Sequence, residues 1–249
     1  MTQQEITYKT LIDQMLTFEG SMTDTYSRFY NYSYYNMALL YYQGVKTPVA
    51  TYKKWLELGR QVQKGSKAKV ICIPRMYKNE EEELEIAGFS LRPTVFEYSQ
   101  TDGEELEMPE PKSWHILTAT EKLGIKEVSY NALIGNNGNS QGYSIKTEYA
   151  VSPMAKYPLK TTLHEIAHIV LGHTTRQTQD EEHSGIREFQ AEATAYLVMK
   201  ELKMTKCMNE SESRAYVQNW VKDAKIEEKD LKQVFTAVNK IINAGREEA

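Results

Sequence analysis

The segment LHEIAHIVLGH, residues 163–173, places two histidines four positions apart in an otherwise apolar stretch. Residues four apart lie on one face of a helix, so His164 and His168 can direct both imidazoles to a single ion. The apolar residues around them predict a helix that is buried along its other faces. Gly172 predicts where that helix ends. We therefore expect a rigid, buried helix over residues 159–171 that presents a metal site.

The glutamate inside the motif indicates hydrolytic chemistry. Glu165 follows the first histidine directly, where it is turned away from the ligand positions and can accept a proton from water at the ion. Two neutral imidazoles and an open coordination position suit zinc, which brings the pKa of bound water towards neutrality. The motif predicts one Zn²⁺ held by His164 and His168, with Glu165 as the general base of a metallopeptidase-type site.

A catalytic zinc ion usually has a third protein ligand, and the next amphipathic segment offers it. The stretch REFQAEATAYLVMK, in a helix expected over residues 186–203, carries Glu188 and Glu192 on one face. Glu192 is the favoured ligand because small alanines surround it and allow two helices to approach closely. Glu188 is the alternative ligand, or a partner that orients one histidine. His173, beyond the end of the first helix, and His183, in a polar stretch, are weaker candidates.

The remaining patterns predict an α+β protein in two parts. Helical patterns cover residues 4–19, 33–43, 51–59, 114–123, 210–225 and 228–244, and strand patterns cover 69–74, 86–98, 128–134, 141–145 and 149–152. Residues 99–113 are acidic, contain prolines and carry few large apolar side chains, as is typical of a linker. We expect a small mixed domain over residues 1–100, an acidic linker over 101–112 and a metal-site domain over 113–249.

Basic residues are concentrated in the N-terminal part of a chain whose formal net charge is −4. Between residues 44 and 78, nine lysines and arginines stand against Glu57 alone, which favours a polyanionic partner over a merely solvated basic face. Aromatic rings stack on unpaired bases while Lys and Arg follow the phosphates. The residues that we expect to contact single-stranded DNA in this way are Tyr42, Tyr52, Trp55, Arg60, Lys64, Lys67 and Lys69. Most other tyrosines of this part are expected to pack the core.

Length and composition favour a soluble, cytoplasmic protein. A chain of 249 residues can bury one large core or two small ones. It has no apolar run of about eighteen residues that could span a bilayer, and its first residues lack the basic and apolar regions of a signal peptide. Cys72 and Cys207 show no CxxC spacing, so we expect two reduced thiols, with a single disulfide as the alternative.

These motifs resemble those of known families. HEIAHIVLGH, followed by EFQAEATAYLV, is similar to the zinc-peptidase domain of the ImmA/IrrE group and of ArdC-type antirestriction proteins. RFYNYSYYNMALLYYQ and ATYKKWLELGRQVQKGSKAKVICIP resemble the ArdC N-terminal domain, and SRAYVQNWVK resembles a segment near the end of ArdC-like proteins. The most specific elements are HExxH and W-x-x-x-G-R-x-V-x-K-G.

The resemblance implies a single-stranded-DNA-binding module followed by a zincin-like metallopeptidase domain, with an active-site helix, a small sheet and C-terminal helices. It implies that Glu192, in the E-A pair, is the third metal ligand. It also implies carriage by plasmids, phages or integrative elements, and protection of incoming DNA. It does not specify a peptide substrate.

Two other interpretations stay open. In one, the metal is structural and the protein acts by binding DNA without catalysis, although a purely structural zinc has no need of Glu165. In the other, the protein is an ImmA/IrrE-like regulatory protease that cleaves a repressor, and the basic region contacts a protein. Tyr143 and Tyr149, in expected strands, are candidates for stabilising the oxyanion of a peptidase.

Overall fold

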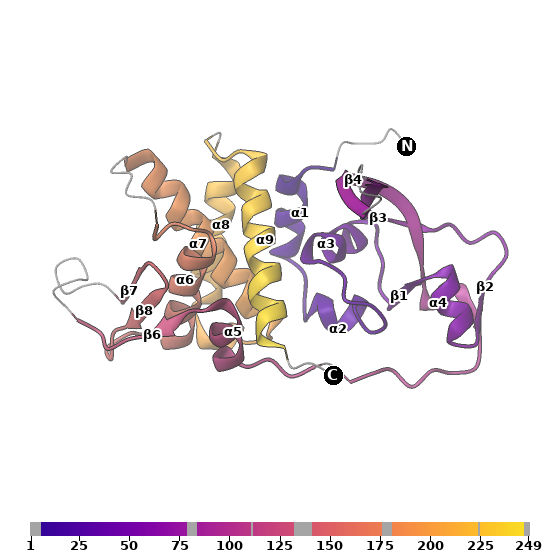
Figure 1. Cartoon of the computed structure of the whole chain (residues 1–249), viewed down its shortest axis with the longest axis horizontal. Coiled ribbons are helices and arrows are strands. Elements are labelled where there is room, and N and C mark those ends of the chain that lie inside the picture. The colour runs from indigo at the N-terminus through magenta and orange to yellow at the C-terminus, as the bar shows by residue number, and fades with distance from the viewer. Residues whose placement is uncertain are drawn as a thin grey trace. The chain divides into compact units, whose positions relative to one another are not determined.

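The computed structural model describes residues 6–78, 84–110, 112–131, 141–175, 181–223 and 225–246 (Figure 1). The chain divides into two compact units: an N-terminal unit, Met22–Pro111, and a C-terminal unit that joins Met1–Ser21 to Lys112–Ala249. Helices and strands occur in both, which confirms the predicted α+β class. No helix in the described ranges combines the length and apolar character needed to cross a membrane. Cys72 and Cys207 are not joined in a disulfide.

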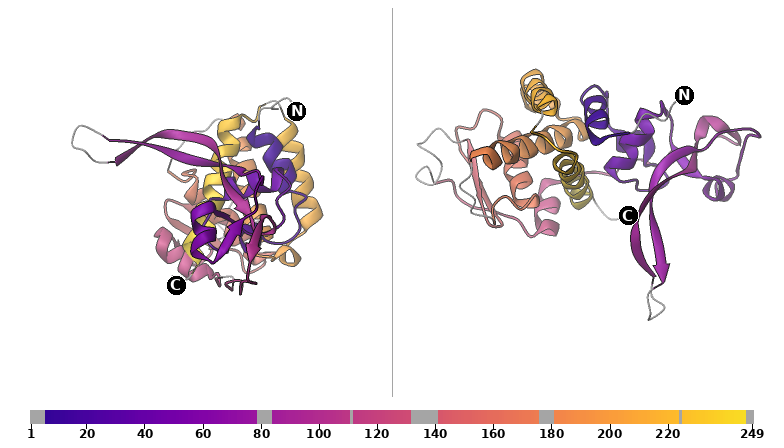
Figure 2. Two further views of the ribbon diagram at one scale, coloured as in Figure 1. Left: turned by 90° about the vertical axis from the view of Figure 1, so that its right-hand side faces the viewer. Right: turned by 90° about the horizontal axis from the view of Figure 1, so that it is seen from above.

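The N-terminal unit packs short helices against two antiparallel sheets. Its described helices and strands are α2 (Met22–Tyr26), α3 (Tyr34–Tyr42), β1 (Val49–Thr51), α4 (Tyr52–Glu57), β2 (Arg60–Val62), β3 (Lys69–Lys78), β4 (Leu84–Glu97) and β5 (Thr101–Gly103). Strand β4 pairs with both β1 and β3, and β2 pairs with β5. Strands β3 and β4 form a long hairpin that projects as an arm from the rest of the unit (Figure 2).

Two amide side chains, Asn36 in α3 and Gln43 at its C-cap, join this helix to the edge strand β3. Asn36 accepts from the N–H of Cys72 at 2.8 Å and donates to its carbonyl at 3.0 Å. Gln43 does the same for Val70, at 2.8 and 2.7 Å. An open sheet edge leaves its backbone groups without partners. The two amides supply those partners, so the base of the hairpin is fixed to the core of the unit.

The expected acidic linker begins later than the sequence indicates. Residues 101–103 form β5, and Leu106 packs against the small core around Trp55. The backbone carbonyl of Glu104 also accepts a hydrogen bond from Arg60. The sequence pattern of residues 99–113 did not indicate this strand, because few of its side chains are apolar. The strand is stabilised by its pairing with β2.

The C-terminal unit includes one helix from the N-terminal end of the chain. In α1 (Tyr8–Met15), Leu11 and Ile12 are fully buried. The amide of Tyr8 donates to the Glu228 carboxylate at 2.6 Å, and the Lys200 ammonium donates to backbone carbonyls at the end of α1. Residues 1–21 thus pack with residues 112–249, whereas the predicted boundary placed them in the N-terminal domain. An amphipathic helix carries no information about which surface it will cover.

Helices dominate the rest of this unit. Its other described helices and strands are α5 (Ile116–Leu123), β6 (Lys126–Glu127), β7 (Gly142–Ile145), β8 (Glu148–Val151), α6 (Pro158–Val170), α7 (Glu181–Glu201), a 3₁₀ turn (Thr205–Cys207), α8 (Glu210–Lys222) and α9 (Glu228–Gly245). The sheet has the order β6-β8-β7, with β6 parallel and β7 antiparallel to β8. The strand expected over residues 128–134 is replaced by β6, and residues 132–140 lie outside the described residues. Helix α6 packs against α7 and against this sheet.

Candidate functional site

Helix α6 holds the two histidines of the HExxH motif in a fixed orientation. Pro158 stands in its first turn, where the missing N–H breaks no helical hydrogen bond. Leu163 and Ile166 are fully buried and set the rotation of the helix about its axis. His164 and His168 consequently lie together on a face that is only slightly exposed, with 19% and 12% of their side chains accessible.

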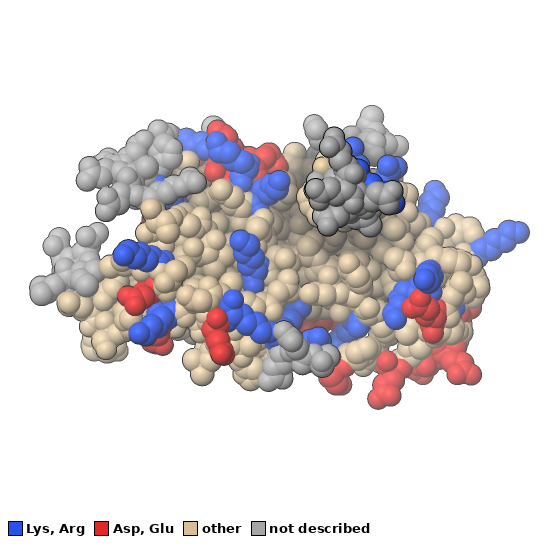
Figure 3. Space-filling view, viewed as in Figure 1, with Lys and Arg blue, Asp and Glu red and all other residues tan. Residues whose placement is uncertain are grey.

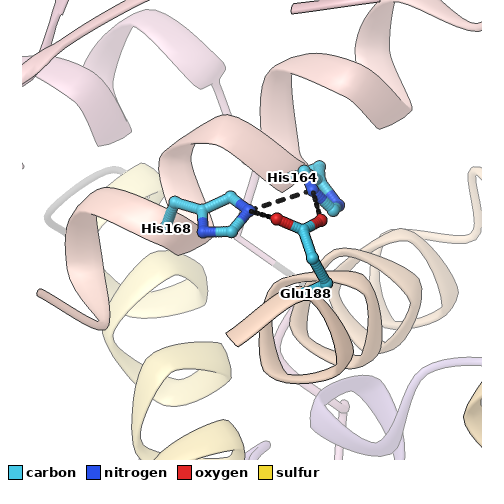
Figure 4. A group of neighbouring side chains, drawn as sticks. All are labelled: His164, His168 and Glu188. Atoms are coloured by element: carbon cyan, nitrogen blue, oxygen red, sulfur yellow. Dashed lines mark hydrogen bonds and ion pairs between the residues drawn. The ribbon is translucent and has the colours of Figure 1, made fainter. Parts of the chain in front are cut away.

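Two imidazoles and one carboxylate converge in this structure (Figure 4). His164 Nε2 lies 3.1 Å from His168 Nε2, while Glu188 places one oxygen 3.3 Å from the former and the other 3.4 Å from the latter. Ligands at about 2.0–2.1 Å from a tetrahedral ion are about 3.3 Å from one another. The three separations are close to that spacing, and the two glutamate distances involve different oxygens of the same carboxylate.

The electrostatics of this cluster favour a cation. Burial alone would lower the pKa of His164, but the carboxylates of Glu188 and Glu192, each 3.3 Å from one of its nitrogens, outweigh it and raise that pKa to about 9. Hydrogen bonds from His164 and His168 hold the pKa of Glu188 well below its usual range. The metal-free cluster therefore holds a proton on His164 at neutral pH. A divalent ion at the same place would take over the role of that positive charge beside the carboxylates.

Glu192, the ligand favoured by the sequence, lies on the other side of His164. Its Oε2 is 3.3 Å from His164 Nδ1 and 2.7 Å from Lys160 Nζ. Burial raises the pKa of Glu192, but His164 and Lys160 outweigh it and bring the value to about 2. The carboxylate grouped with both Nε2 atoms is that of Glu188, the predicted alternative. Both glutamates belong to α7 and are one turn apart, so each reaches a different nitrogen of the same ring.

The predicted general base is buried beside strand β7. Glu165 is 7% exposed, and its Oε2 accepts a hydrogen bond from Ser144 Oγ at 2.8 Å. A Cβ at Gly142 would lie 2.8 Å from the Thr161 methyl and 3.1 Å from Glu165 Oε1, so only glycine lets the strand pass this close. Ser144 was missed by the sequence reasoning. The only signal was a glycine within a strand pattern.

His173 takes a position that the sequence did not suggest. It does not join the Nε2 cluster, but its Nδ1 lies 3.0 Å from His168 Nδ1, on the far side of that ring. Burial and the charge of His168 lower the pKa of His173 to about 4. It is therefore a neutral histidine in contact with a candidate ligand.

A cleft of about 560 Å³ lies beside the cluster. His164, Glu188 and Glu192 line it together with Lys156, Lys160, Tyr157 and, from α8, Tyr216. Tyr143 and Tyr149, the predicted oxyanion stabilisers, are not among its lining residues. The Tyr143 hydroxyl instead contacts the backbone of Asn131 and Ser129, and Tyr149 is 4% exposed with its hydroxyl 3.3 Å from Glu127.

Two residues predicted to bind DNA are structural. Trp55 is fully buried and donates its indole N–H to the Phe96 carbonyl at 3.0 Å. Arg60 is 6% exposed, donates to the side chain and carbonyl of Thr101 at 2.7 and 2.8 Å, and lies 4.2 Å from the centre of the Tyr98 ring. Neither can reach a nucleic acid, and this corrects the prediction. Arg60 thereby joins β2 to β5, while Trp55 packs with Ala50 and Val62 in the small core of the unit.

The other predicted residues differ in how accessible they are. Lys69 is held by Glu97 at 2.9 Å, and Tyr42 is half-buried. Tyr52 is 45% exposed and accepts from Gln61, while Lys64 and Lys67 are exposed. On the face drawn in Figure 3, basic and acidic side chains are interspersed. The local excess of lysines and arginines in the sequence does not form one continuous basic field there.

The N-terminal unit has an aromatic cleft of its own, of about 660 Å³. Tyr30 and Phe89 line it, and both rings are more than half exposed, at 64% and 62%. Lys53 and Lys54 also line it, and Lys54 is paired with Glu57 at 3.4 Å. Sequence reasoning did not select these residues, because only the tertiary fold brings the β3–β4 hairpin beside the segment before α3.

Residues 14–113 match the family model for the N-terminal domain of anti-restriction factor ArdC. An uncharacterized protein of Bacillus anthracis is 27% identical over an alignment of 276 positions, which covers 87% of this chain and 46% of the relative. The chain therefore spans less than half the length of this curated relative.

Two crystal structures of the antirestriction protein ArdC from plasmid R388 share the fold. The metal-free structure has a TM-score of 0.53 and 19% identity, covering 96% of this chain and 94% of that one. The Mn(II)-bound structure has a TM-score of 0.58 and 18% identity, covering 96% and 97%. At this identity the likeness shows a shared fold and no more.

Proposed function

We propose that this chain is an ArdC-type, mobile-element antirestriction protein in which a DNA-binding unit accompanies a zinc-dependent, peptidase-type centre, as the match of residues 14–113 and the shared fold support. One observation carries the second part of this proposal. The Nε2 atoms of His164 and His168 and the carboxylate of Glu188 are spaced as ligands of one ion, and Glu165 follows the first of them on the same helix.

The donor set suits zinc. Two imidazole nitrogens and one carboxylate oxygen, with a cleft alongside, are typical of a catalytic zinc site with an open position. The related ArdC structure contains Mn(II), which supports a divalent ion, and nitrogen donors bind zinc more tightly than manganese. When bound, the ion would supply Lewis acidity to polarise a peptide carbonyl.

The remaining steps of peptide hydrolysis fall to side chains of the chain itself. Glu165 would take a proton from the attacking water and pass it to the leaving amine, and Ser144 would orient its carboxylate. Tyr216 lines the cleft, and burial raises the pKa of its phenol. A phenol that keeps its proton can donate a hydrogen bond to the developing oxyanion.

Metal analysis tests the centre. After purification and dialysis we expect about one equivalent of zinc per chain, because the proposed ligands form a single cluster. The variants His164→Ala and His168→Ala should lose it, while His115→Ala, which removes an exposed histidine outside the cluster, should keep it. Wild-type protein that takes up no divalent ion would refute the metal centre.

A second test separates catalysis from a purely structural metal. The Glu165→Gln variant should keep its metal, because Glu165 is not a ligand, and should lose any hydrolytic step. The measurement is the transformation efficiency of unmodified plasmid DNA in a restricting strain that carries either protein. Full protection by Glu165→Gln would favour the alternative in which the metal is structural. In that case the hydrogen bond from Ser144 to Glu165 would serve only to hold β7 beside α6.

We propose that single-stranded DNA binds in the aromatic cleft of the N-terminal unit. Two largely exposed rings, Tyr30 and Phe89, can stack on unpaired bases, and Lys53 at the same cleft can neutralise a phosphate. Duplex DNA offers no open base face to such rings. We therefore expect single strands to bind more tightly than duplexes of the same length.

Fluorescence anisotropy with a labelled oligonucleotide tests this interface. Tyr30→Ala and Phe89→Ala should each weaken binding by about 1–3 kcal/mol. The matched control is Tyr77→Ala, an exposed tyrosine that does not line the cleft and is not among the predicted DNA contacts. If only the control weakens binding, the DNA lies elsewhere on the unit. If single strands do not bind even at low salt, the alternative of a regulatory protease with a protein partner is favoured.

A further inference from the structure

The end of helix α6 directs the chain back towards its own histidine. Gly172 has a φ of +77°, a left-handed conformation that costs glycine little and other residues more. The next amide, that of His173, then donates to the carbonyl of His168 at 2.9 Å, as in a Schellman motif. The two rings meet with their centres 5.1 Å apart.

From this contact a chain of hydrogen bonds runs into the core. His168 Nδ1 lies 3.0 Å from His173 Nδ1, and His173 Nε2 lies 3.1 Å from the Gln190 side-chain oxygen. The Gln190 amide nitrogen donates to Gln233 Oε1 at 2.6 Å and to the Asp230 carbonyl at 3.2 Å. Gln190 itself is 3% exposed. The chain therefore connects α6, α7 and α9 within one unit.

The direction of every hydrogen bond follows once His168 uses Nε2 as a metal ligand. A neutral imidazole that coordinates through Nε2 carries its proton on Nδ1 and must donate from there. His173 Nδ1 can only accept this bond, so the proton of His173 lies on Nε2. That proton is donated to the oxygen of Gln190, whose amide nitrogen is directed towards two acceptors. All members can be satisfied in one arrangement, with no donor facing a donor.

We propose that His173 and Gln190 are positioning residues that fix the tautomer and the ring orientation of His168 for metal binding. This inference rests on the proposed metal centre. It adds a function for His173, which lies on the far side of the His168 ring and is not a ligand. Outer partners of metal-bound histidines are worth about 10–100-fold in metal affinity.

Metal affinity of the full chain, measured by competition with a chromophoric zinc chelator, tests the proposal. His173→Phe keeps an aromatic ring but cannot accept the hydrogen bond, and we expect about 10–100-fold weaker zinc binding. In His173→Gln, an oxygen and a nitrogen stand about as far apart as the imidazole nitrogens, so this variant should recover much of the loss. His115→Phe makes the same chemical change at an exposed histidine outside the chain and should bind zinc normally.

A spectroscopic measurement on the wild-type protein guards against variants that fold poorly. In the zinc-loaded protein, ¹⁵N chemical shifts of the histidines should show His168 protonated at Nδ1 and His173 protonated at Nε2. His173 protonated on Nδ1, or unchanged zinc affinity in His173→Phe, overturns the inference while leaving the metal centre intact. Failure of the wild type to bind any metal refutes the centre itself, so the two failures are distinguishable.

Discussion

At the scale of single residues, two glutamates one helical turn apart contact different nitrogens of His164. Glu188 faces Nε2 and is half exposed, whereas Glu192 faces Nδ1 and is buried against Lys160. Metal-bound imidazoles commonly donate their remaining N–H to a carboxylate. The geometry therefore favours Glu188 as the ligand and Glu192 as the group that orients His164, which reverses the order expected from the sequence.

The pair Glu188→Gln and Glu192→Gln tests this division. An amide coordinates zinc poorly, so Glu188→Gln should abolish stable zinc binding. Glu192→Gln retains a hydrogen-bond acceptor and should weaken binding by about 10–100-fold. Zinc content after dialysis against a weak chelator distinguishes them. Complete loss in the second variant with retention in the first would restore Glu192 as the ligand.

The raised pKa of His164 predicts how metal binding depends on pH. In the metal-free protein this pKa is raised from 6.5 to about 9. The protonated ring therefore adds to the free energy of unfolding in full below pH 6.5. That contribution is lost as pH rises through about 9. Zinc requires the neutral ring. Uptake near neutral pH should release about one proton, and the apparent affinity should rise with pH by up to about tenfold per unit between these values.

Calorimetry in buffers of different ionisation enthalpy measures this proton release directly. Titrations above pH 9 serve as the internal control, because His164 is then already neutral and the release should vanish. Binding that releases no proton at neutral pH would show that His164 is not protonated in the metal-free protein.

At the scale of secondary structure, two helices of the C-terminal unit end in the same way but with different consequences. Gly124 ends α5 and Gly172 ends α6, both at positive φ. A Cβ would meet nothing within 4 Å at Gly124, and only the Thr175 hydroxyl, at 4.0 Å, at Gly172. Only the second turn places a histidine against a candidate metal ligand.

The substitutions Gly124→Ala and Gly172→Ala form a matched pair. Each should lower the free energy of unfolding by about 1–2 kcal/mol, because alanine is strained in the left-handed region. Only Gly172→Ala should also weaken zinc binding, because it disturbs the approach of His173 to His168. Thermal unfolding and zinc titration of both variants provide the comparison, and equal zinc affinities would separate this turn from the metal centre.

At the scale of the whole molecule, the first helix belongs to the unit that carries the metal cluster. Ile12 in α1 is fully buried in that unit, and Leu40 in α3 is fully buried in the N-terminal unit. Truncation of a buried isoleucine or leucine to alanine costs about 2–5 kcal/mol. Each substitution should therefore destabilise only the unit in which its side chain is packed.

Scanning calorimetry with and without zinc can assign these effects. Zinc should raise the transition temperature of the C-terminal unit, because a ligand stabilises the state that binds it. Ile12→Ala should lower that same zinc-sensitive transition, and Leu40→Ala should lower the other. If Ile12→Ala instead lowers the zinc-insensitive transition, α1 belongs with the N-terminal unit.

Local patterns were sufficient to predict most helices and strands. The helix expected over residues 159–171 is observed as Pro158–Val170, and that over 228–244 as Glu228–Gly245. The strand pattern of the hairpin was recognised as well, although β3 extends to Lys78. These elements depend on periodicity, capping residues and glycine stops, all of which lie within a few residues of one another.

The sequence by itself determined that His164 and His168 share a helical face, because four residues make about one turn. It could not determine which carboxylate meets them, because that depends on how far α7 slides along α6. Nor could it show that Trp55 and Arg60 are buried, that residues 1–21 join the distant C-terminal unit, or that His173 turns back onto His168. These outcomes depend on contacts between segments far apart in the chain, or on a turn whose direction is set by a single backbone angle, and only the tertiary structure decided them.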